Sequence, residues 1–487
     1  MATFEKDRKR RIIYNDDSDQ QYEGYEGYKY VITDEQSFID ARTTPTFDTH
    51  VDTYSWCVGN GCEPPWKGTS RLRACLGSFE HVNDVIVEAC HAKGMEVWAS
   101  LRMNDIHDSF MANCYEETND PLKAEHPEYL IEPEKSRSLT NDVTERFLWS
   151  AFNFARPEVR EYRLNYIRKN AAAHDFDGYE LDFSRFVWNF PLGEDRRDAP
   201  LMTQLIRDVR KSLSKIGKKR KRPYTFAVHV MDSPRTSLEL GQDVETWLAE
   251  GLVDVIVMGM GYMPYVMPVA QWVELGKRYG VPVYPSVNTN TYGTGWEKLH
   301  GRPMLHEAVR ASSAYYWQQG ADGLYLFNLF CAEDRTIGAW PRDYIYAPLK
   351  EIGDPKLMVG NDKLYTIQPS ADSGFCHHGS EMTPLPVSLD STEHKLPLQM
   401  GPDAEDANAK VRVRALTSGG KEDAKVYFRL NHRLLQVQRR GEWCEADVPA
   451  GVTRSGLNEL SIWCSAEPDQ RGNPIVVHRL FVPVTYG

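Results

Sequence analysis

FDGYELDFSRF, residues 176–186, is an apolar segment interrupted by two acids, Glu180 and Asp182. Side chains alternate between the two faces of a β-strand, so both carboxylates point to one face and Tyr179 and Leu181 to the other. A buried carboxylate is costly unless it is paired, and two like charges on one face raise the pKa of at least one of them. A strand with a purely structural role would rarely carry this pair, so the stretch predicts an active site.

Around this strand, short apolar segments that end in polar residues alternate with longer segments of helical periodicity. We expect strands at residues 12–15, 49–57, 96–103, 176–186, 224–231, 253–260, 281–287 and 323–327, and helices at 79–93, 157–173, 199–216 and 307–320. Eight strands that alternate with helices predict a (β/α)8 TIM barrel of the α/β class. A doubly wound sheet is the alternative, but no glycine-rich turn follows the first expected strand.

The composition changes after Pro341, where apolar residues begin to alternate instead of recurring at helical spacing. Short strands are expected at residues 411–414, 426–430, 460–463 and 476–482, with a turn at Ser418-Gly419-Gly420. This pattern predicts a C-terminal β-sandwich. We therefore expect a catalytic barrel at residues 1–348, a linker at 349–363 and an accessory sandwich at 364–487, which serves as a buttress rather than as a carbohydrate-binding module.

Barrel enzymes place their active sites at the C-terminal ends of the strands. Cleavage of a glycosidic bond needs two carboxyl groups, one of which donates a proton. We expect Asp182 to act as nucleophile or base, Glu180 as its partner or modulator, and Asp105 as the acid on a neighbouring strand. The other strand ends supply the expected substrate-binding residues, which are Asp17, Trp56, Arg102, Asn104, His107, Arg185, His229, Tyr262, Asn288 and Asn328.

Arg102 faces the barrel interior on its expected strand and could pair with Glu180. Together with Arg185, His107 and His229 it would make the site more basic than the acidic exterior. This charge pattern predicts a sugar that carries a carboxylate or a sulfate.

Two other function classes stay open at this point. Asp17, Asp105, His107, Asp182 and His229 are all of metal-ligand type, so a metal-dependent lyase or isomerase on the same barrel is one alternative. We nevertheless expect no catalytic metal and no cofactor, because no HxH, HExxH, GxSxG, GxGxxG or Walker A motif is present. A non-catalytic glycan-binding protein is the second alternative.

The composition limits the partners. With 41% hydrophobic and 26% charged residues, the chain has the make-up of a soluble globular protein. Its net charge of −12 argues against nucleic-acid binding, and the basic run at residues 218–222 is expected to be a solvated loop. No apolar segment is long enough to span a membrane. The expected partner is a carbohydrate substrate, and the sequence leaves the oligomeric state open.

The location of the protein is predicted from its N-terminus and its cysteines. Residues 1–11 are polar and lack the apolar core of a secretory signal, which indicates a cytoplasmic protein unless the sequence belongs to a longer exported precursor. Nine cysteines show no repeated CxxC spacing, so we expect mostly reduced, buried thiols.

The segments 159–167 and 176–183 resemble the family-ten-like glycosyl hydrolases, whose fourth barrel strand carries an Asp-Gly and two acids two residues apart. The resemblance covers roughly residues 11–348 and implies carbohydrate cleavage, with Glu180 and Asp182 as active-site acids. Chitinase-like barrels differ, because Phe183-Ser184 follows Asp182 where they continue to a glutamate. Retaining endoglycanases differ too, because Ser286 and Asn288 stand where they carry a glutamate on the seventh strand.

Overall fold

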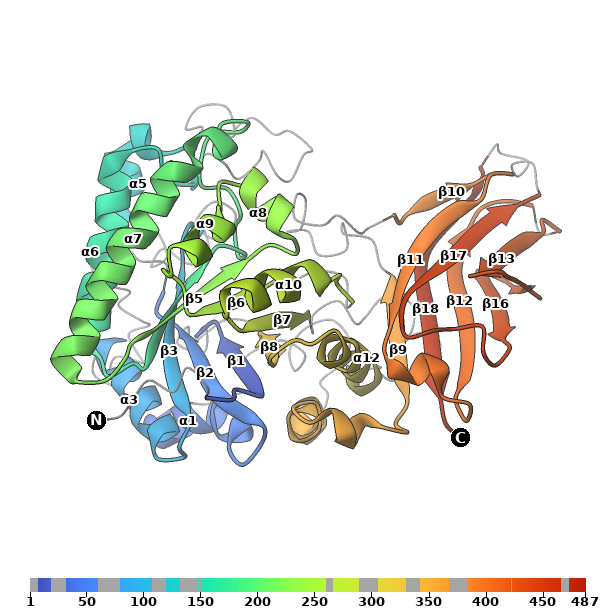
Figure 1. The fold of residues 1–487 in the computed structure, drawn as a ribbon, viewed down its shortest axis with the longest axis horizontal. Coiled ribbons are helices and arrows are strands. Elements are labelled where there is room, and N and C mark those ends of the chain that lie inside the picture. Colours follow the sequence, from blue (N-terminus) through green and yellow to red (C-terminus); the bar gives the residue numbers. More distant parts are fainter. Residues whose placement is uncertain are drawn as a thin grey trace.

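The computed structural model describes residues 8–18, 32–59, 79–106, 120–131, 148, 150–259, 266–288, 305–329, 342–367, 384–421, 423–465 and 473–487. They form a closed barrel wrapped by helices and, beside it, a pair of antiparallel sheets (Figure 1). The predicted fold class, a TIM barrel followed by a β-sandwich, is confirmed.

The barrel consists of eight parallel strands in the order of the sequence, with β8 paired to β1. Every strand overlaps the segment expected from the sequence. The strands are β1 (Ile12–Asp16), β2 (Val51–Cys57), β3 (Glu96–Arg102), β4 (Gly178–Asp182), β5 (Thr225–Val230), β6 (Val255–Met258), β7 (Val283–Asn288) and β8 (Leu324–Phe327).

Helices cover the outside of the barrel. In the described residues, no helix is both long and apolar enough to cross a membrane. The longer ones are α1 (Glu35–Arg42), α3 (Phe79–His91), α6 (Pro157–Ala173), α7 (Asp195–Arg220), α10 (Ala270–Tyr279) and α12 (Leu305–Gln318). The shorter ones are η2 (Thr44–Thr46), α5 (Pro121–Glu125), η4 (Pro127–Tyr129), α8 (Pro234–Glu239), α9 (Val244–Ala249), α13 (Arg342–Tyr346), η7 (Ala347–Lys350) and η8 (Pro355–Met358).

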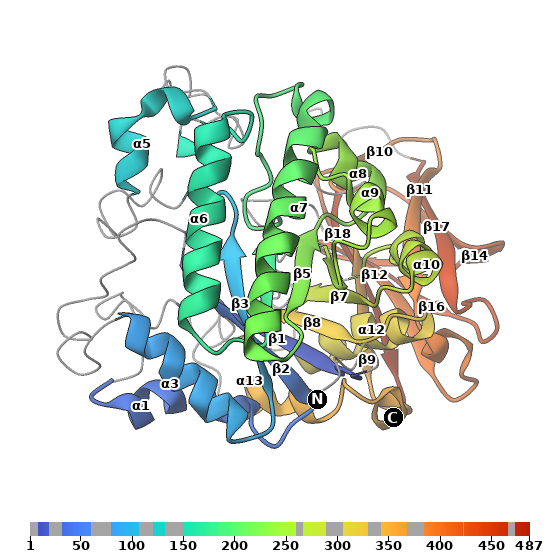
Figure 2. The same cartoon turned by 60° about the vertical axis from the view of Figure 1, so that its left-hand side comes forward.

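Helices α6 and α7 lie side by side on the outside of the barrel, next to β3 and β5 (Figure 2). The expected solvated loop at residues 218–222 is wrong, because most of this basic run forms the last turn of α7. Arg220 donates hydrogen bonds to the carbonyl oxygens of Ala171 and His174 at the end of α6. Cations near a helix C-terminus also interact favourably with the helix dipole.

The barrel interior is filled by side chains from alternate strand positions. The apolar ones are Ile13, Trp98, Ala227, Val255, Val257, Tyr284, Tyr325 and Phe327. Trp98 packs directly on Gly178, where a Cβ atom would lie 2.6 Å from Cδ1 of the indole. The glycine that precedes the two acids of β4 is therefore required by packing inside the barrel.

A repeated carboxylate contact closes the N-terminal end of the barrel. An aspartate at or just before the start of each even-numbered strand accepts a backbone N–H at the start of the preceding strand. The pairs are Asp52 with Arg11 (2.7 Å), Asp177 with Val97 (2.9 Å), Asp254 with Phe226 (2.9 Å) and Asp322 with Val283 (2.9 Å). Contacts at the N-terminal end of a barrel serve stability rather than chemistry.

The C-terminal sandwich has two sheets. One contains β9 (Lys363–Ile367), β10 (Val387–Leu389), β12 (Lys410–Ser418), β15 (Gln438–Arg440), β16 (Trp443–Val448) and β18 (Ile475–Thr485). The other contains β11 (His394–Met400), β13 (Val426–Leu430), β14 (Arg433–Leu435) and β17 (Gly456–Cys464). Cys57, Cys90, Cys444 and Cys464, the cysteines within the described ranges, are buried thiols.

The connector between the two parts is packed rather than open. It contains η7 and η8, and it buries Leu349, Ile352 and Met358. At its end, the buried Lys363 ammonium lies 2.6 Å from a carboxylate oxygen of Asp403. The exact domain bounds stay a prediction, but the short helices and the buried residues show how the sandwich is attached to the barrel.

Candidate active site

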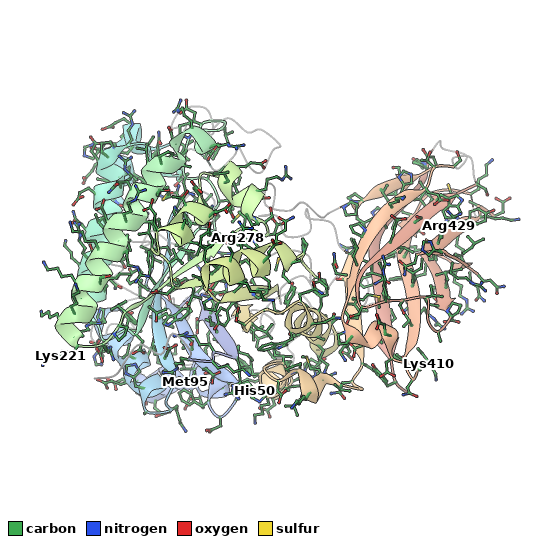
Figure 3. All side chains as sticks on the ribbon, in the orientation of Figure 1. His50, Met95, Lys221, Arg278, Lys410 and Arg429 are labelled. Carbon is green, nitrogen blue, oxygen red and sulfur yellow. The ribbon has the colours of Figure 1, made fainter. Side chains whose placement is uncertain are left out.

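The eight strands are parallel, so their C-terminal ends lie at one end of the barrel, here called the barrel mouth. In Figure 3, the labelled His50, Met95 and Lys221 lie along the lower edge of the barrel. His50 and Met95 directly precede β2 and β3, so this lower edge is the N-terminal end of the strands. The barrel mouth therefore faces upward in the figure, and inward-facing side chains near the ends of the strands can meet there.

Glu180 lies inside the barrel and is fully buried. Three hydroxyl groups donate to its carboxylate: Ser55 to Oε2 at 3.0 Å, and Ser100 and Tyr325 to Oε1 at 2.9 Å each. Burial raises the pKa of Glu180 to about 7, and the neighbouring charge of Asp182 contributes, while the three hydroxyls act in the opposite direction. Glu180 therefore exchanges its proton near neutral pH although it has no access to solvent.

Asp182 is the last residue of β4 and lies one layer above Glu180, at the barrel mouth. Its Oδ1 atom accepts backbone hydrogen bonds from Ser184 at 2.8 Å and from Arg185 at 3.0 Å. These two bonds fix the orientation of the carboxylate. No hydrogen bond to Oδ2 is found within the described ranges, and the residue is 3% exposed. The second oxygen is thus the one that a ligand can reach.

His229 on β5 is the nearest ionisable neighbour of Asp182. Its Nε2 atom lies 2.5 Å from the carbonyl oxygen of Gly259, so Nε2 carries the hydrogen. Burial lowers the pKa of His229, which makes the imidazole neutral near pH 7 and leaves a lone pair on Nδ1. This Nδ1 atom lies 3.5 Å from Oδ1 of Asp182 and has no hydrogen-bond partner. The His229 ring packs against Tyr325 at a centroid distance of 4.9 Å.

The expected pair of Arg102 with Glu180 is wrong. Arg102 does face the interior, but its Nη1 atom binds Asp105 at 3.1 Å and its Nη2 atom lies 3.5 Å from Asp17. Asp17 in turn accepts a hydrogen bond from Asn328 at 2.9 Å. Across β3 and β4, Ser100 is in register with Glu180 and Arg102 with Asp182, so Arg102 lies one pleat repeat nearer the barrel mouth than Glu180 does.

This arrangement bears on the expected role of Asp105. A carboxylate held by a buried guanidinium is a poor proton donor, because the cation favours its charged form. A second cation, Lys123, donates to the backbone oxygen of Asp105 at 2.8 Å. The structure thus shows Asp105 bound to Arg102 and Lys123, and its role as the general acid stays a prediction.

The charges at the barrel mouth also bear on the expected anionic sugar. Arg102 contacts two carboxylates, Asp17 and Asp105, and His229 is neutral. The guanidinium of Arg185 lies over the rings of Phe186 and Phe327, at 5.8 Å and 5.7 Å from their centroids. Among the described groups, Arg102 and His229 thus add no net positive charge while Arg185 keeps its own, and the anionic sugar stays a prediction.

Two expected substrate-binding residues have other functions in the structure. Trp56 is fully buried and faces outward from the barrel, where its Nε1 atom donates to Asn83 on α3 at 2.9 Å. Its neighbour Ser55 points inward, because side chains alternate along β2. Asn104 binds three backbone groups, the N–H and the carbonyl of Phe152 and the carbonyl of Trp188, and thereby fixes two loop segments.

The remaining expected residues are only partly described. His107 and Tyr262 lie outside the described residues. Asn288 ends β7, but its side chain is not among the described atoms.

Several residues at the site were not predicted from the sequence. Ser55, Ser100 and Tyr325 surround Glu180, and Arg42 on α1 binds Asp17 at 3.4 Å. Strand alternation alone places the two serines and the tyrosine inside the barrel. Their contact with one carboxylate depends on how four strands close around it, which the sequence does not show.

Neither a metal centre nor the described cavity coincides with this site. Within the ranges that the structure describes, no three His, Cys, Asp or Glu side chains lie close enough together to hold a metal ion. A cavity of about 690 Å³ lies elsewhere, between α1, η2, α13 and η7. It is lined by Asp40, Thr44, Pro45, Phe47, Arg342, Asp343, Tyr346, Ala347 and Lys350.

Comparison with known proteins gives similar structures but no family. No protein-family model and no curated protein matches the chain, so the family-ten-like resemblance stays a prediction. The α-amylase of Geobacillus thermoleovorans is 12% identical, with a TM-score of 0.44, over 93% of this chain and 98% of the amylase. The α-L-fucosidase isoenzyme 2 of Paenibacillus thiaminolyticus is 14% identical, with a TM-score of 0.41, over 79% of this chain and 51% of the fucosidase.

A chitinase of Rhizomucor miehei is 11% identical, with a TM-score of 0.36, over 62% of this chain and 93% of the chitinase. These structural neighbours are glycoside hydrolases. Their identities and scores are too low to assign a function to this chain, and a functional proposal has to come from the site itself.

Proposed function

We propose that this protein is a glycoside hydrolase in which Asp182 is the reacting carboxylate. The observation that carries the proposal is the state of the Asp182 side chain at the barrel mouth. Two backbone amides hold one oxygen, and the other oxygen has no hydrogen bond from the described residues. An oriented carboxylate with one available oxygen can serve as the nucleophile or the base in cleavage of a glycosidic bond.

Two reaction routes are compatible with this geometry. As a nucleophile, Asp182 Oδ2 forms an ester bond to the anomeric carbon while the bond to the leaving oxygen breaks, and water later hydrolyses the ester. As a base, Asp182 takes a proton from a water molecule whose oxygen attacks the anomeric carbon. In both routes the leaving oxygen receives a proton from a second acid, and the distance between the two carboxyl groups determines which route is used.

Glu180 supports Asp182 from beneath rather than touching the substrate. It lies one layer below Asp182 and both of its oxygens accept hydrogen bonds from hydroxyl groups of the barrel, so neither oxygen is left for a sugar. Because burial raises the pKa of Glu180 to about 7, part of the protein carries an uncharged Glu180 beneath Asp182 near neutral pH. As the proton donor we propose Asp232 in place of Asp105, because Asp232 is a buried aspartate two residues after β5, the strand next to β4.

The decisive experiment is hydrolysis of a panel of polysaccharides by the wild type and by Asp182→Asn. The matched control is Asp322→Asn at the opposite end of the barrel, where the amide oxygen can still accept the Val283 N–H. We expect Asp182→Asn to lose at least about a thousandfold in kcat and the control to keep wild-type activity. Equal activity of Asp182→Asn and wild type would contradict the proposal.

The same panel separates the two alternatives. Activity that a chelator abolishes in the wild type would indicate the metal-dependent lyase or isomerase. Binding without turnover on every glycan would indicate the non-catalytic glycan-binding protein.

We further propose that the sandwich is a buttress for the barrel. Within the sandwich, the buried Lys363–Asp403 ion pair and the Tyr365 hydroxyl, which binds Asp403 and the backbone N–H of Gly401, hold the segment that meets the barrel. Gly401 also packs against α12, since a Cβ atom there would lie 3.2 Å from the backbone nitrogen of Tyr315. If this is correct, Lys363→Met lowers the melting temperature of the barrel together with that of the sandwich, in a single transition.

A further inference from the structure

Two acceptor atoms face each other at the barrel mouth without a hydrogen between them. Oδ1 of Asp182 accepts hydrogen bonds, and Nδ1 of His229 can only accept, because the hydrogen of the neutral ring is committed to Gly259. The two atoms are 3.5 Å apart, and Nδ1 is fully buried without a partner. A buried acceptor without a donor costs free energy, and native proteins keep few of them.

A second buried polar group without a partner lies on the same side of the barrel. The hydroxyl of Ser286 on β7 has no hydrogen bond, and the residue is 1% exposed. Ser286 pairs in register with Tyr325, whose ring packs against His229. Gly259 lies between β5 and β7: its carbonyl accepts from His229, and a Cβ atom on it would lie 3.8 Å from Cβ of Ser286.

The chemistry of these atoms restricts the group that can satisfy them. His229 Nδ1 needs a donor and the neighbouring Asp182 carboxylate can only accept, which excludes a carboxylate or sulfate from this position. Ser286 can both donate and accept, so an oxygen that carries its own hydrogen matches it better than an ammonium group, which cannot accept. An uncharged hydroxyl fulfils both requirements.

We propose that β4, β5 and β7 form a subsite for an uncharged hydroxyl-bearing part of the ligand, in which a ligand hydroxyl donates to His229 Nδ1 beside Asp182 and a neighbouring ligand oxygen binds Ser286. The proposal deepens the proposed function and rests on the same barrel mouth. It gives His229 and Ser286 a role in specificity, while the bond-breaking chemistry belongs to Asp182.

The test is direct binding of monosaccharides, measured by saturation-transfer NMR titration. The probes are glucose, galactose, mannose, xylose and fucose, with glucuronate and galacturonate as anionic counterparts and glucosamine as a cationic one. We expect at least one neutral sugar to bind more tightly than every anionic or cationic probe. Binding of no neutral sugar by the wild type, or tighter binding of an acidic or amino sugar, would overturn the proposal.

Two variants assign the binding to these residues. His229→Phe keeps a ring against Tyr325 but removes Nδ1, and Ser286→Ala removes only the hydroxyl. We expect the first to weaken neutral-sugar binding at least about tenfold and the second about threefold or more. The matched control is Ser313→Ala on α12, because Ser313 is equally buried and its hydroxyl also has no partner. Unchanged binding in both site variants would overturn the proposal.

A stability measurement separates binding from a structural role. Because the Ser286 hydroxyl has no partner, Ser286→Ala should leave the melting temperature unchanged or raise it while binding weakens. If Ser286→Ala lowers the melting temperature so far that partial unfolding explains the lost binding, Ser286 stabilises the fold and the subsite is contradicted.

The binding assay is also independent of catalysis. Loss of binding in His229→Phe without any turnover by the wild type would retain the subsite and refute the hydrolase. Turnover that depends on Asp182, together with sugar binding that is insensitive to His229 and Ser286, would support the hydrolase and refute the subsite.

Discussion

The hydroxyl of Tyr325 on β8 donates a hydrogen bond of 2.9 Å to Oε1 of Glu180 on β4, across the inside of the barrel. The contact joins two strands that are not neighbours in the sheet. Together with Ser55 and Ser100 it holds a carboxyl group whose pKa burial raises to about 7 from its ordinary value of 4.5. This relationship leads to a prediction about stability.

The free energy of unfolding should fall as the pH rises from about 4.5 to about 7. Over this interval the folded protein keeps the proton of Glu180 while the unfolded chain releases it, so the folded state binds more protons and loses stability with rising pH. The shift corresponds to at most about 3 kcal/mol. Glu180→Gln cannot titrate and should flatten this part of the curve. Urea unfolding at several pH values checks it, and equal slopes in wild type and variant would contradict it.

Removing the Arg102 guanidinium should take from the buried Asp17 and Asp105 the cation that they share, although Asp17 keeps its contact with Arg42. We expect Arg102→Met to lower the free energy of unfolding by about 3–5 kcal/mol. Arg197→Met is a matched control, because Arg197 also binds two carboxylates, those of Glu194 and Asp198, but is 64% exposed. The control should cost less than about 1 kcal/mol. Urea unfolding measures both free energies. Similar losses in the two variants would show that burial does not increase the contribution of an arginine to the free energy of unfolding.

The aspartates at the N-terminal end of the barrel can be tested at Asp322, which accepts the Val283 N–H at 2.9 Å. Asp322→Ala leaves this N–H without its partner and should cost about 1–3 kcal/mol. Asp322→Asn keeps an acceptor oxygen, so its cost should be clearly smaller. The order of the two melting temperatures decides the question: an alanine variant as stable as the asparagine variant would rule out this role.

Gly178 should not accept a side chain, because a Cβ atom there would lie 2.6 Å from Cδ1 of Trp98. Overpacking of this kind costs about 1–3 kcal/mol, which is our expectation for Gly178→Ala. Trp98→Val removes the indole and makes room, so the two substitutions together should cost less than the sum of their separate effects. Additive costs in a double-mutant cycle would mean that the two positions do not interact.

If the protein hydrolyses glycans, it should prefer neutral ones over those that contain uronic acids. Arg102 is compensated by Asp17 and Asp105, and His229 is neutral, so these groups offer no net positive charge to an anionic sugar. Reducing ends released from matched neutral and acidic polysaccharides measure the preference. Faster hydrolysis of the acidic polymers would contradict this prediction and would support the basic site that we expected from the sequence.

The sequence alone predicted the architecture well. Apolar segments with a period of two and helical segments between them gave all eight barrel strands, and the bounds of α6 were predicted to the residue. It also placed Glu180, Asp182, Arg102 and His229 on inward-facing strand positions, because the alternation of side chains is a local property of the backbone. Trp56 was misplaced because it was judged by its residue type rather than by its position in that alternation.

What the sequence determined by itself is the order of strands and helices and the face of each strand that carries its acids, since both follow from local periodicity. Only the tertiary structure decided which groups meet. Closure of the barrel brings the hydroxyls of Ser55, Ser100 and Tyr325 to Glu180. It also places Arg102 against Asp17 and Asp105 and not against Glu180, the expected partner. These contacts join residues far apart in the chain, and their partners depend on the three-dimensional register of the strands, which local periodicity does not contain.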